Sequence, residues 1–133
     1  MLKLEIVTPE KKVFDDSVES VTVPTASGQA GILASHVPVI SALKPGILII
    51  EQKGRSERIA VSEGFVEVSG DLVSVLTDSA DMPSDIDVAA ARSDKDAAEK
   101  ALAAVSTASL EETRDLRTRL ELADARLELI SNR

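Results

Sequence analysis

The sequence has 133 residues, of which 44% are hydrophobic and 2% aromatic, a size that allows one compact domain with a small appendage and excludes a multidomain enzyme. Its formal net charge of -8 repels phosphate backbones and anionic lipid, which argues against nucleic acid as a partner. Cysteine is absent and His36 is the only histidine, so disulfides, thiolate nucleophiles and zinc sites built from these residues are excluded.

The N-terminal segment lacks the features of a targeting signal. It has neither a basic region nor a long apolar run, and no later segment approaches the ~18 apolar residues of a membrane span. We therefore expect the protein to stay in the cytoplasm.

Residues 1–83 show the pattern of an all-β unit. They contain every proline, glycine and phenylalanine of the chain, and apolar residues alternate with others at 2–7 and 21–23, as in half-buried strands. Further short apolar runs follow at 39–43, 47–50, 58–61, 65–68 and 72–77, and turn residues separate them at 24–31, 44–46, 53–54 and 69–71. This spacing predicts an antiparallel β-sandwich or barrel.

Residues 84–133 show the pattern of two helices. Ser84 with Asp87, and Ser109 with Glu112, have the spacing of capping boxes, which places a helix start at each serine. The segment 106–109 is the expected turn between the helices. We therefore predict an antiparallel helical hairpin.

The alanines and leucines predict which faces of the helices pack. They are Ala90, Ala97, Ala101, Ala104 and Ala108 in the first helix, and Leu116, Leu120, Ala123, Leu127 and Ile130 in the second. Because a methyl group buries much less area than a leucine side chain, we expect the hairpin to dock weakly on the sandwich. Elements with few buried contacts detach easily, so the hairpin is a candidate moving part.

The sequence offers no catalytic centre. It has no Gly-x-Ser-x-Gly elbow, no phosphate-binding loop and no cluster of bases that would activate a nucleophile. For His36, which lies in a loop rich in glycine and proline, a structural role is favoured over acid–base catalysis. We therefore assign no catalytic residue, no metal site and no cofactor.

Four arginines of the second helix have two interpretations. They are Arg114, Arg117, Arg119 and Arg126, and they lie among acidic residues. One interpretation is a solvated surface with intrahelical ion pairs such as Asp115 with Arg119. The other is a binding face. Composition and spacing alone therefore lead to a non-enzymatic interaction module.

Four ordered sequence blocks resemble the epsilon subunit of bacterial and plastid rotary ATP synthases. They are LEIVTPE at 4–10, GQAGILASHVP at 28–38 continued by LKPG at 43–46, EGFVEV at 63–68, and VLTDSA at 75–80. The order of a strand-rich part followed by a helical hairpin also agrees, so the resemblance covers the full chain.

The resemblance implies a ten-stranded β-sandwich at residues 1–83 and a regulatory two-helix hairpin at 84–133. In that family the sandwich binds the gamma subunit and rests on the ring of c subunits, so it couples proton flow to ATP synthesis without chemistry of its own. The hairpin folds against the sandwich or extends into the alpha/beta catalytic head, where it blocks ATP hydrolysis. The implied location is peripheral, at the cytoplasmic face of the bacterial inner membrane.

The resemblance also implies roles for single residues. Gln29 falls where the family's loop touches the c-ring, and His36 lies in the same signature segment. Arg114, Arg117, Arg119 and Arg126 are the candidates for the inhibitory contact with the catalytic head.

Some relatives bind ATP on the folded hairpin through a motif of the form Ile-Asp-x-x-Arg-Ala. Ile86 and Asp87 match its start, but Ala90 and Ala97 stand where arginines are expected. Because each lost arginine removes a charge-assisted contact, we expect this chain not to bind ATP.

Two functions of other classes remain as alternatives. One is a free-standing scaffold or chaperone-like adaptor, whose sandwich and hairpin each bind a partner. The other is a small hydrolase that uses carboxylates, for which the sequence suggests no residue pair.

Overall fold

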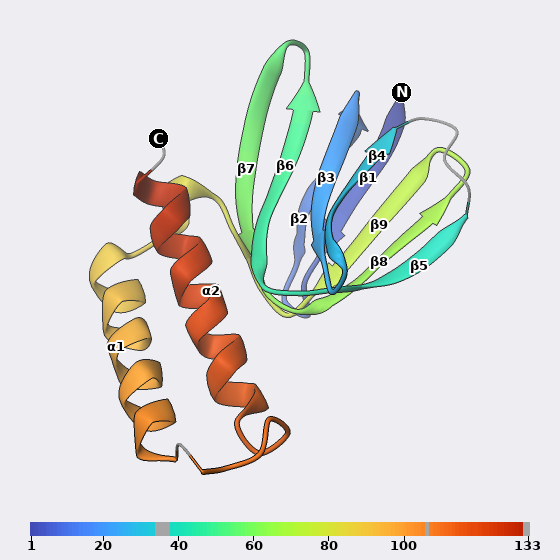
Figure 1. Cartoon of the computed structure of the whole chain (residues 1–133). Coiled ribbons are helices and arrows are strands. Elements are labelled where there is room, and N and C mark those ends of the chain that lie inside the picture. The colour runs from blue at the N-terminus through green and yellow to red at the C-terminus, as the bar shows by residue number, and fades with distance from the viewer. Residues whose placement is uncertain (34–37, 106, 132–133) are drawn as a thin grey trace.

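The computed structural model describes residues 1–33, 38–105 and 107–131, which form a strand-rich body followed by two helices (Figure 1). The strands are β1 (Leu2–Val7), β2 (Lys12–Val18), β3 (Ser20–Thr25), β4 (Gly28–Leu33), β5 (Val39–Leu43), β6 (Gly46–Gln52), β7 (Arg55–Val61), β8 (Gly64–Ser69), β9 (Leu72–Thr77) and β10 (Ala80–Asp81). The predicted combination of a β-sandwich with a helical hairpin is confirmed.

The strands follow the order β10-β7-β6-β3-β5-β8-β9-β1-β2, and β4 pairs with β3 outside this path. The described pairings are antiparallel except that of β1 with β9, which is parallel. Hydrogen bonds also join strand β2 to the end of β6, since Gln52 Nε2 donates to Asp16 Oδ2 at 2.9 Å and to the Ser17 carbonyl at 2.8 Å. The curved sheet therefore closes around one core.

Three strands are absent from the sequence-based prediction. Strand β2 contains Lys12, Asp15 and Asp16 and leaves most of its residues exposed, so it lacks the alternation of a half-buried strand. The two glycines of β4 resemble a turn in the sequence, and β10 has only two residues. Each of these strands is held by pairing with a neighbour rather than by its own apolar pattern.

The core of the sandwich consists of aliphatic side chains from both layers. It comprises Leu2, Leu4, Ile6, Val18, Val21, Val23, Ile32, Leu43, Leu48, Ile50, Ile59, Val61, Val66, Val68, Val73 and Val75, each at most 4% exposed. A fully buried side chain of this size stabilises the fold by about 1.5–3 kcal/mol. The sandwich therefore has a core of its own, independent of the helices.

The helical part begins later than the sequence predicts. A short 3₁₀ turn spans Pro83–Asp85, helix α1 spans Val88–Ala104, and helix α2 spans Arg114–Ser131. Asp87 rather than Ser84 caps α1, since its carboxylate accepts from the Ala90 amide at 3.1 Å. The capping box of Ser84 was wrong because Pro83 starts the 3₁₀ turn at this point.

The second expected capping box forms, but the helix does not begin there. Ser109 Oγ accepts from the Glu112 amide at 3.2 Å and donates to the Glu112 carboxylate at 3.2 Å. These bonds stabilise a turn, and α2 follows from Arg114. No helix among the described residues is long and apolar enough to cross a membrane.

Helix α2 packs on the sandwich, and α1 packs on α2 (Figure 1). Ala125 and Leu129 of α2 are buried against Ala60 of β7, with Ile47 and Ile86 beside them. Of the predicted seam in α2, Ala123 is buried and the other members are half-buried. The sequence pattern missed the second buried face of α2, which the sandwich covers.

The predicted alanine stripe of α1 was wrong by one residue. Ala91 and Ala98 are buried, whereas Ala90 and Ala97 are exposed. A shift of one residue turns a helix face by about 100°. Alanines occur at 89–91 and 97–98, so composition does not distinguish the packed face from its neighbours.

Candidate functional site

The sandwich carries an apolar face on the outside of β5, β8, β9 and β1. Ala42, Phe65, Leu76 and Val7 lie directly opposite one another across these four strands. Phe65 is 58% exposed and Leu76 is 47% exposed. Ile40, two residues before Ala42 on β5 and so on the same side of the strand, is 68% exposed. Contiguous apolar surface of this kind is typical of a protein interface.

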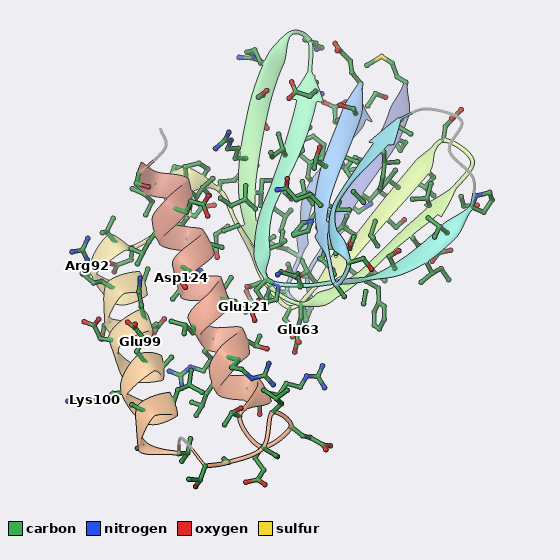
Figure 2. The ribbon with its side chains drawn as sticks, viewed as in Figure 1. Glu63, Arg92, Glu99, Lys100, Glu121 and Asp124 are labelled. Atoms are coloured by element: carbon green, nitrogen blue, oxygen red, sulfur yellow. The ribbon has the colours of Figure 1, made fainter. Side chains whose placement is uncertain are left out.

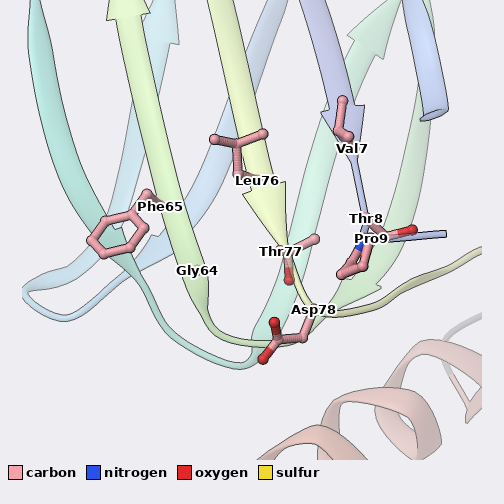
Figure 3. Close-up of a pocket in the computed structure, with 8 residues that line it drawn as sticks. All are labelled: Val7, Thr8, Pro9, Gly64, Phe65, Leu76, Thr77 and Asp78. Atoms are coloured by element: carbon pink, nitrogen blue, oxygen red, sulfur yellow. The ribbon is translucent and has the colours of Figure 1, made fainter. Parts of the chain in front are cut away.

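The apolar face contains a shallow depression, about 390 Å³ in volume, at the end of the strands (Figure 3). It is lined by Val7, Thr8, Pro9, Gly64, Phe65, Leu76, Thr77 and Asp78. Gly64 permits this shape, because a Cβ atom there would lie 1.9 Å from the Leu76 carbonyl oxygen. The close approach of β8 and β9 therefore requires glycine.

Gln29 lies at the same end of the sandwich as the apolar face. It pairs with Pro24, just after a tight turn at 26–27, and it is exposed. The Thr25 hydroxyl supports the turn, since it donates to the Gly28 carbonyl at 2.6 Å and accepts from the Ser27 amide at 3.3 Å. Gly28 has a φ of 117°, a conformation that disfavours any other residue. His36 lies outside the described residues.

The four arginines of α2 do not form one surface. Arg126 donates from Nε to Asp81 Oδ2 at 2.8 Å, and these side chains are 24% and 25% exposed. Arg114 makes a longer contact of 3.5 Å with Glu63, at the border of the apolar face. Both arginines therefore bind carboxylates of the sandwich while the hairpin is folded. Figure 2 shows Glu63 at the end of the sandwich that faces α2.

The other two arginines differ from each other. Arg117 holds the turn between the helices, since it donates to the Leu110 carbonyl and, at 3.2 Å, to the Thr113 hydroxyl. Arg119 is exposed, and its side chain has no hydrogen bond or ion pair within the described part of the chain. The intrahelical pair of Asp115 with Arg119, given as an example under the solvated-surface interpretation, is not formed among the described residues.

Ile86 and Asp87 lie beside a cavity of about 200 Å³ between α1, α2 and β10. The cavity is lined by Asp81, Asp85, Ile86, Asp87, Ala90, Ala91, Asp94 and Arg126. Ile86 packs on the apolar contact of α2, and the Asp87 carboxylate caps α1. The cavity is smaller than the ~300 Å³ of small ligand pockets, and its carboxylates repel a triphosphate.

Two parts of this site were not foreseen. The exposed residues Phe65 and Leu76 had been assigned only to strands, although outward aromatic and aliphatic side chains on neighbouring strands are a usable signal. Asp81 gave no signal, because its partner Arg126 is 45 residues away in the sequence. Within the described residues, no group of three or more histidines or carboxylates is arranged to hold a metal ion.

Comparison with known proteins gives consistent matches. The family model of the delta/epsilon chain of ATP synthase, beta-sandwich domain, matches residues 1–83. The ATP synthase epsilon chain of Magnetococcus marinus is 42% identical over 124 residues, which cover 93% of this chain and 90% of that relative. The epsilon chain of Gloeobacter violaceus is 41% identical over 126 residues, which cover 95% and 94%.

Solved structures show the same likeness. A chain of the Euglena gracilis mitochondrial ATP synthase, in its OSCP/F1/c-ring part, matches with a TM-score of 0.75 and 25% identity, over 96% of this chain and 79% of its own. A chain of the Tetrahymena thermophila central stalk and c-ring matches with a TM-score of 0.55 and 20% identity, over 70% and 71%. The second likeness concerns the fold alone.

Proposed function

This chain belongs to the family of ATP synthase epsilon chains, and we propose that it is a non-catalytic subunit of the central stalk. In this proposal the sandwich docks on the gamma subunit and rests on the ring of c subunits. The hairpin is a movable brake on ATP hydrolysis by the alpha/beta head. The complex sits at the cytoplasmic face of the bacterial inner membrane, and this chain is a peripheral part of it.

The apolar face of the sandwich is the observation that carries the proposal. An exposed Phe65 beside an exposed Leu76 is costly for a free protein and favourable for a subunit that stays bound. The face is rigid, because its side chains belong to four paired strands above the main core. Because torque is transmitted only through a rigid contact, we assign the apolar face to binding of the gamma subunit.

The c-ring contact is assigned to Gln29, near the start of β4 and beside the turn at 26–27. This residue is exposed, and its backbone position is fixed by pairing with Pro24 and by the Thr25 hydroxyl. Gln29 and the apolar face lie at the same end of the sandwich. Gamma on the face and the c-ring at Gln29 would therefore be neighbours at that end. Gln29→Lys should leave assembly unchanged and reduce ATP-driven proton pumping in vesicles. Unchanged pumping would contradict this contact.

The brake is assigned to the hairpin because its attachment is small. Ala125 and Leu129 of α2 pack on Ala60 beside the half-buried Ile47 and Ile86, and two ion pairs join the hairpin to the sandwich. The core within the sandwich has sixteen aliphatic residues. We also propose that ATP is not its ligand, since the acidic cavity beside Asp87 does not fit a triphosphate.

An assembly assay tests the docking proposal. Phe65→Glu and Leu76→Glu each place a carboxylate on the apolar face, so we expect binding to gamma to weaken about tenfold or more. Leu110→Glu is the matched control, because Leu110 is 76% exposed in the turn between the helices and lines neither depression beside Phe65. All three variants should melt as the wild type does, since surface changes usually cost less than ~0.5 kcal/mol.

The same assay distinguishes the alternatives. If the face variants assemble as well as the Leu110 variant, gamma binds elsewhere and the assignment of the face is wrong. If the wild-type chain itself does not co-purify with the ATPase complex, the free-standing adaptor becomes the better explanation.

A further inference from the structure

Of the two ion pairs between the hairpin and the sandwich among the described residues, that of Arg126 with Asp81 is the shorter and the more buried. Among the ion pairs of the described residues, that of Arg126 with Asp81 has the shortest distance, 2.8 Å, and the lowest exposure of both side chains. Burial of about three quarters of each side chain lowers the effective dielectric and strengthens the attraction. It also makes the loss of one partner costly.

The ion pair of Asp81 with Arg126 joins the sandwich to the hairpin at the place where the chain passes from one to the other. Asp81 ends β10, the short strand that pairs with β7 before the chain leaves the sheet. Arg126 lies next to Ala125, whose side chain is buried against Ala60 of β7. The ion pair thus borders the apolar contact of α2 with the sandwich, and neither can open far while the other is closed.

Neighbouring carboxylates further favour the position of the Arg126 guanidinium beside Asp81. Asp85, Asp87 and Asp94 line the same cavity, and Arg126 is the one basic residue among the side chains that line it. Their summed charge attracts the guanidinium and repels an anion that would compete for it. The carboxylates around the cavity therefore have a cationic partner within the folded chain itself.

We propose that Asp81 and Arg126 form a latch that holds the hairpin folded without a nucleotide. The latch also withholds Arg126 from the catalytic head, and this second part rests on the proposed function. The two residues then differ in effect. Loss of Asp81 frees the hairpin with all its arginines, whereas loss of Arg126 frees the hairpin and removes one of its contacts with the head.

A single engineered thiol can report whether the latch opens. The native chain has no cysteine, and Ala125 is 4% exposed at the contact with the sandwich, so Ala125→Cys should react with a maleimide only when α2 lifts. We expect Asp81→Asn to raise the labelling rate of this thiol about tenfold. Asp85→Asn is the matched control, since it removes one carboxylate from the same cavity without breaking the ion pair.

Two further variants separate the latch from general destabilisation. Val68→Cys places a thiol in the sandwich core, and the labelling rate of this core thiol should not change with Asp81→Asn. Arg126→Gln should raise the labelling rate of the Ala125→Cys thiol as Asp81→Asn does, and the double variant should add little, because both changes break one pair. Equal rates for Asp81→Asn and Asp85→Asn, additive effects in the double variant, or a matching rise for the core thiol would each overturn the latch.

The labelling assay uses the full chain without its complex, so its result is independent of docking and braking. In assembled complexes, the withheld arginine predicts that Asp81→Asn slows ATP hydrolysis more than Arg126→Gln does. If labelling shows release but the hydrolysis rates of the two variants are equal, the latch stands and the role of Arg126 at the head is wrong.

Discussion

The sandwich and the hairpin are stabilised in different ways. The sandwich encloses sixteen aliphatic side chains within ten hydrogen-bonded strands. The hairpin has helices of 17 and 18 residues, but it touches the sandwich through Ala125, Leu129 and two ion pairs. Size of an element is therefore a poor measure of its attachment. The area buried against the neighbouring part decides whether the element opens alone.

The two helices also differ in their relation to the sandwich. Helix α2 contacts β6 and β7, whereas α1 packs chiefly on α2. Figure 2 shows Arg92, Glu99 and Lys100 on α1, on the side away from the sandwich. If α2 lifts, α1 has to move with it. The hairpin should therefore open as one unit.

Removal of a core side chain should have the largest effect on stability. Ile59 is fully buried in the sandwich, so we expect Ile59→Ala to lower the free energy of unfolding of the sandwich by about 2–5 kcal/mol. Urea unfolding followed by circular dichroism measures this change. Glu57→Ala on the same strand is the control, with an expected change below ~0.5 kcal/mol. A loss below ~1 kcal/mol for Ile59→Ala would contradict an independent core.

The same deletion in the hairpin should act locally. Leu129 is 2% exposed, so Leu129→Ala should favour hairpin opening by about 2–3 kcal/mol. The urea midpoint of the sandwich should stay unchanged. The amides of α2 should lose protection from hydrogen exchange. A parallel loss of protection in β1 and β9 would show that the two parts unfold together.

Truncation after Pro83 separates the two parts at the level of the complex. The truncated chain should assemble, and its complex should hydrolyse ATP faster, by about fivefold or more if coupling is of the usual size. Arg119→Ala should give a smaller gain, because Arg119 has no partner within the described residues of the folded chain. Arg92→Ala on α1 is its control. Equal rates for intact and truncated complexes would show that the hairpin is structural.

The smallest expected effects come from exposed ion pairs, and they differ between the two parts. A hydrogen bond and charge from Lys3, aided by Lys12, lower the pKa of Asp15 in the sandwich. This stability is present above the unfolded pKa of ~3.9 and is lost as pH falls through the folded pKa. Asp124 raises the pKa of Lys95 in the hairpin. That stability is present below ~10.4 and is lost as pH rises through the folded pKa.

A pH series on two variants checks these signs. Asp15→Asn should weaken the dependence of sandwich stability on pH in the acidic range. Lys95→Met should weaken the dependence of hairpin unfolding, in which α1 separates from α2, on pH in the alkaline range. Glu10→Gln, a change at an exposed carboxylate outside these pairs, is the control. Unchanged pH profiles for both variants would contradict the assigned partners.

The sequence predicted those elements whose own residues carry a period. Leu2, Leu4 and Ile6 mark β1 because they alternate, and the predicted turn at Lys53 and Gly54 is present, with a positive φ at both residues. Strand β2 forms because β1 pairs with it, and the packed face of α1 is decided by the helix α2 that covers it. An exposed strand with Asp15 and Asp16, or a helix with neighbouring alanines, fits several arrangements, and long-range packing selects one.

The candidate site divides in the same way. The glycines at 28 and 31 predicted a turn around Gln29, but the turn lies at 26–27 and Gln29 belongs to strand β4, where pairing with β3 fixes it. The arginines were found as a group, but their separate contacts depend on residues far along the chain. Asp81 and Glu63 approach Arg126 and Arg114 only after the hairpin folds back. Contacts across 45 and 51 residues carry no local signal.

Hydrogen exchange of the wild-type full chain, resolved by peptide, tests the central claim most directly. We predict that the amides of 88–104 and 114–131 exchange together, through an opening that costs much less free energy than the opening of the core strands β1, β6, β7 and β9. In a denaturant series, the helices should then lose protection well before these strands. If helices and core strands exchange at the same free energy with the same denaturant dependence, the hairpin does not open alone, and the account is wrong.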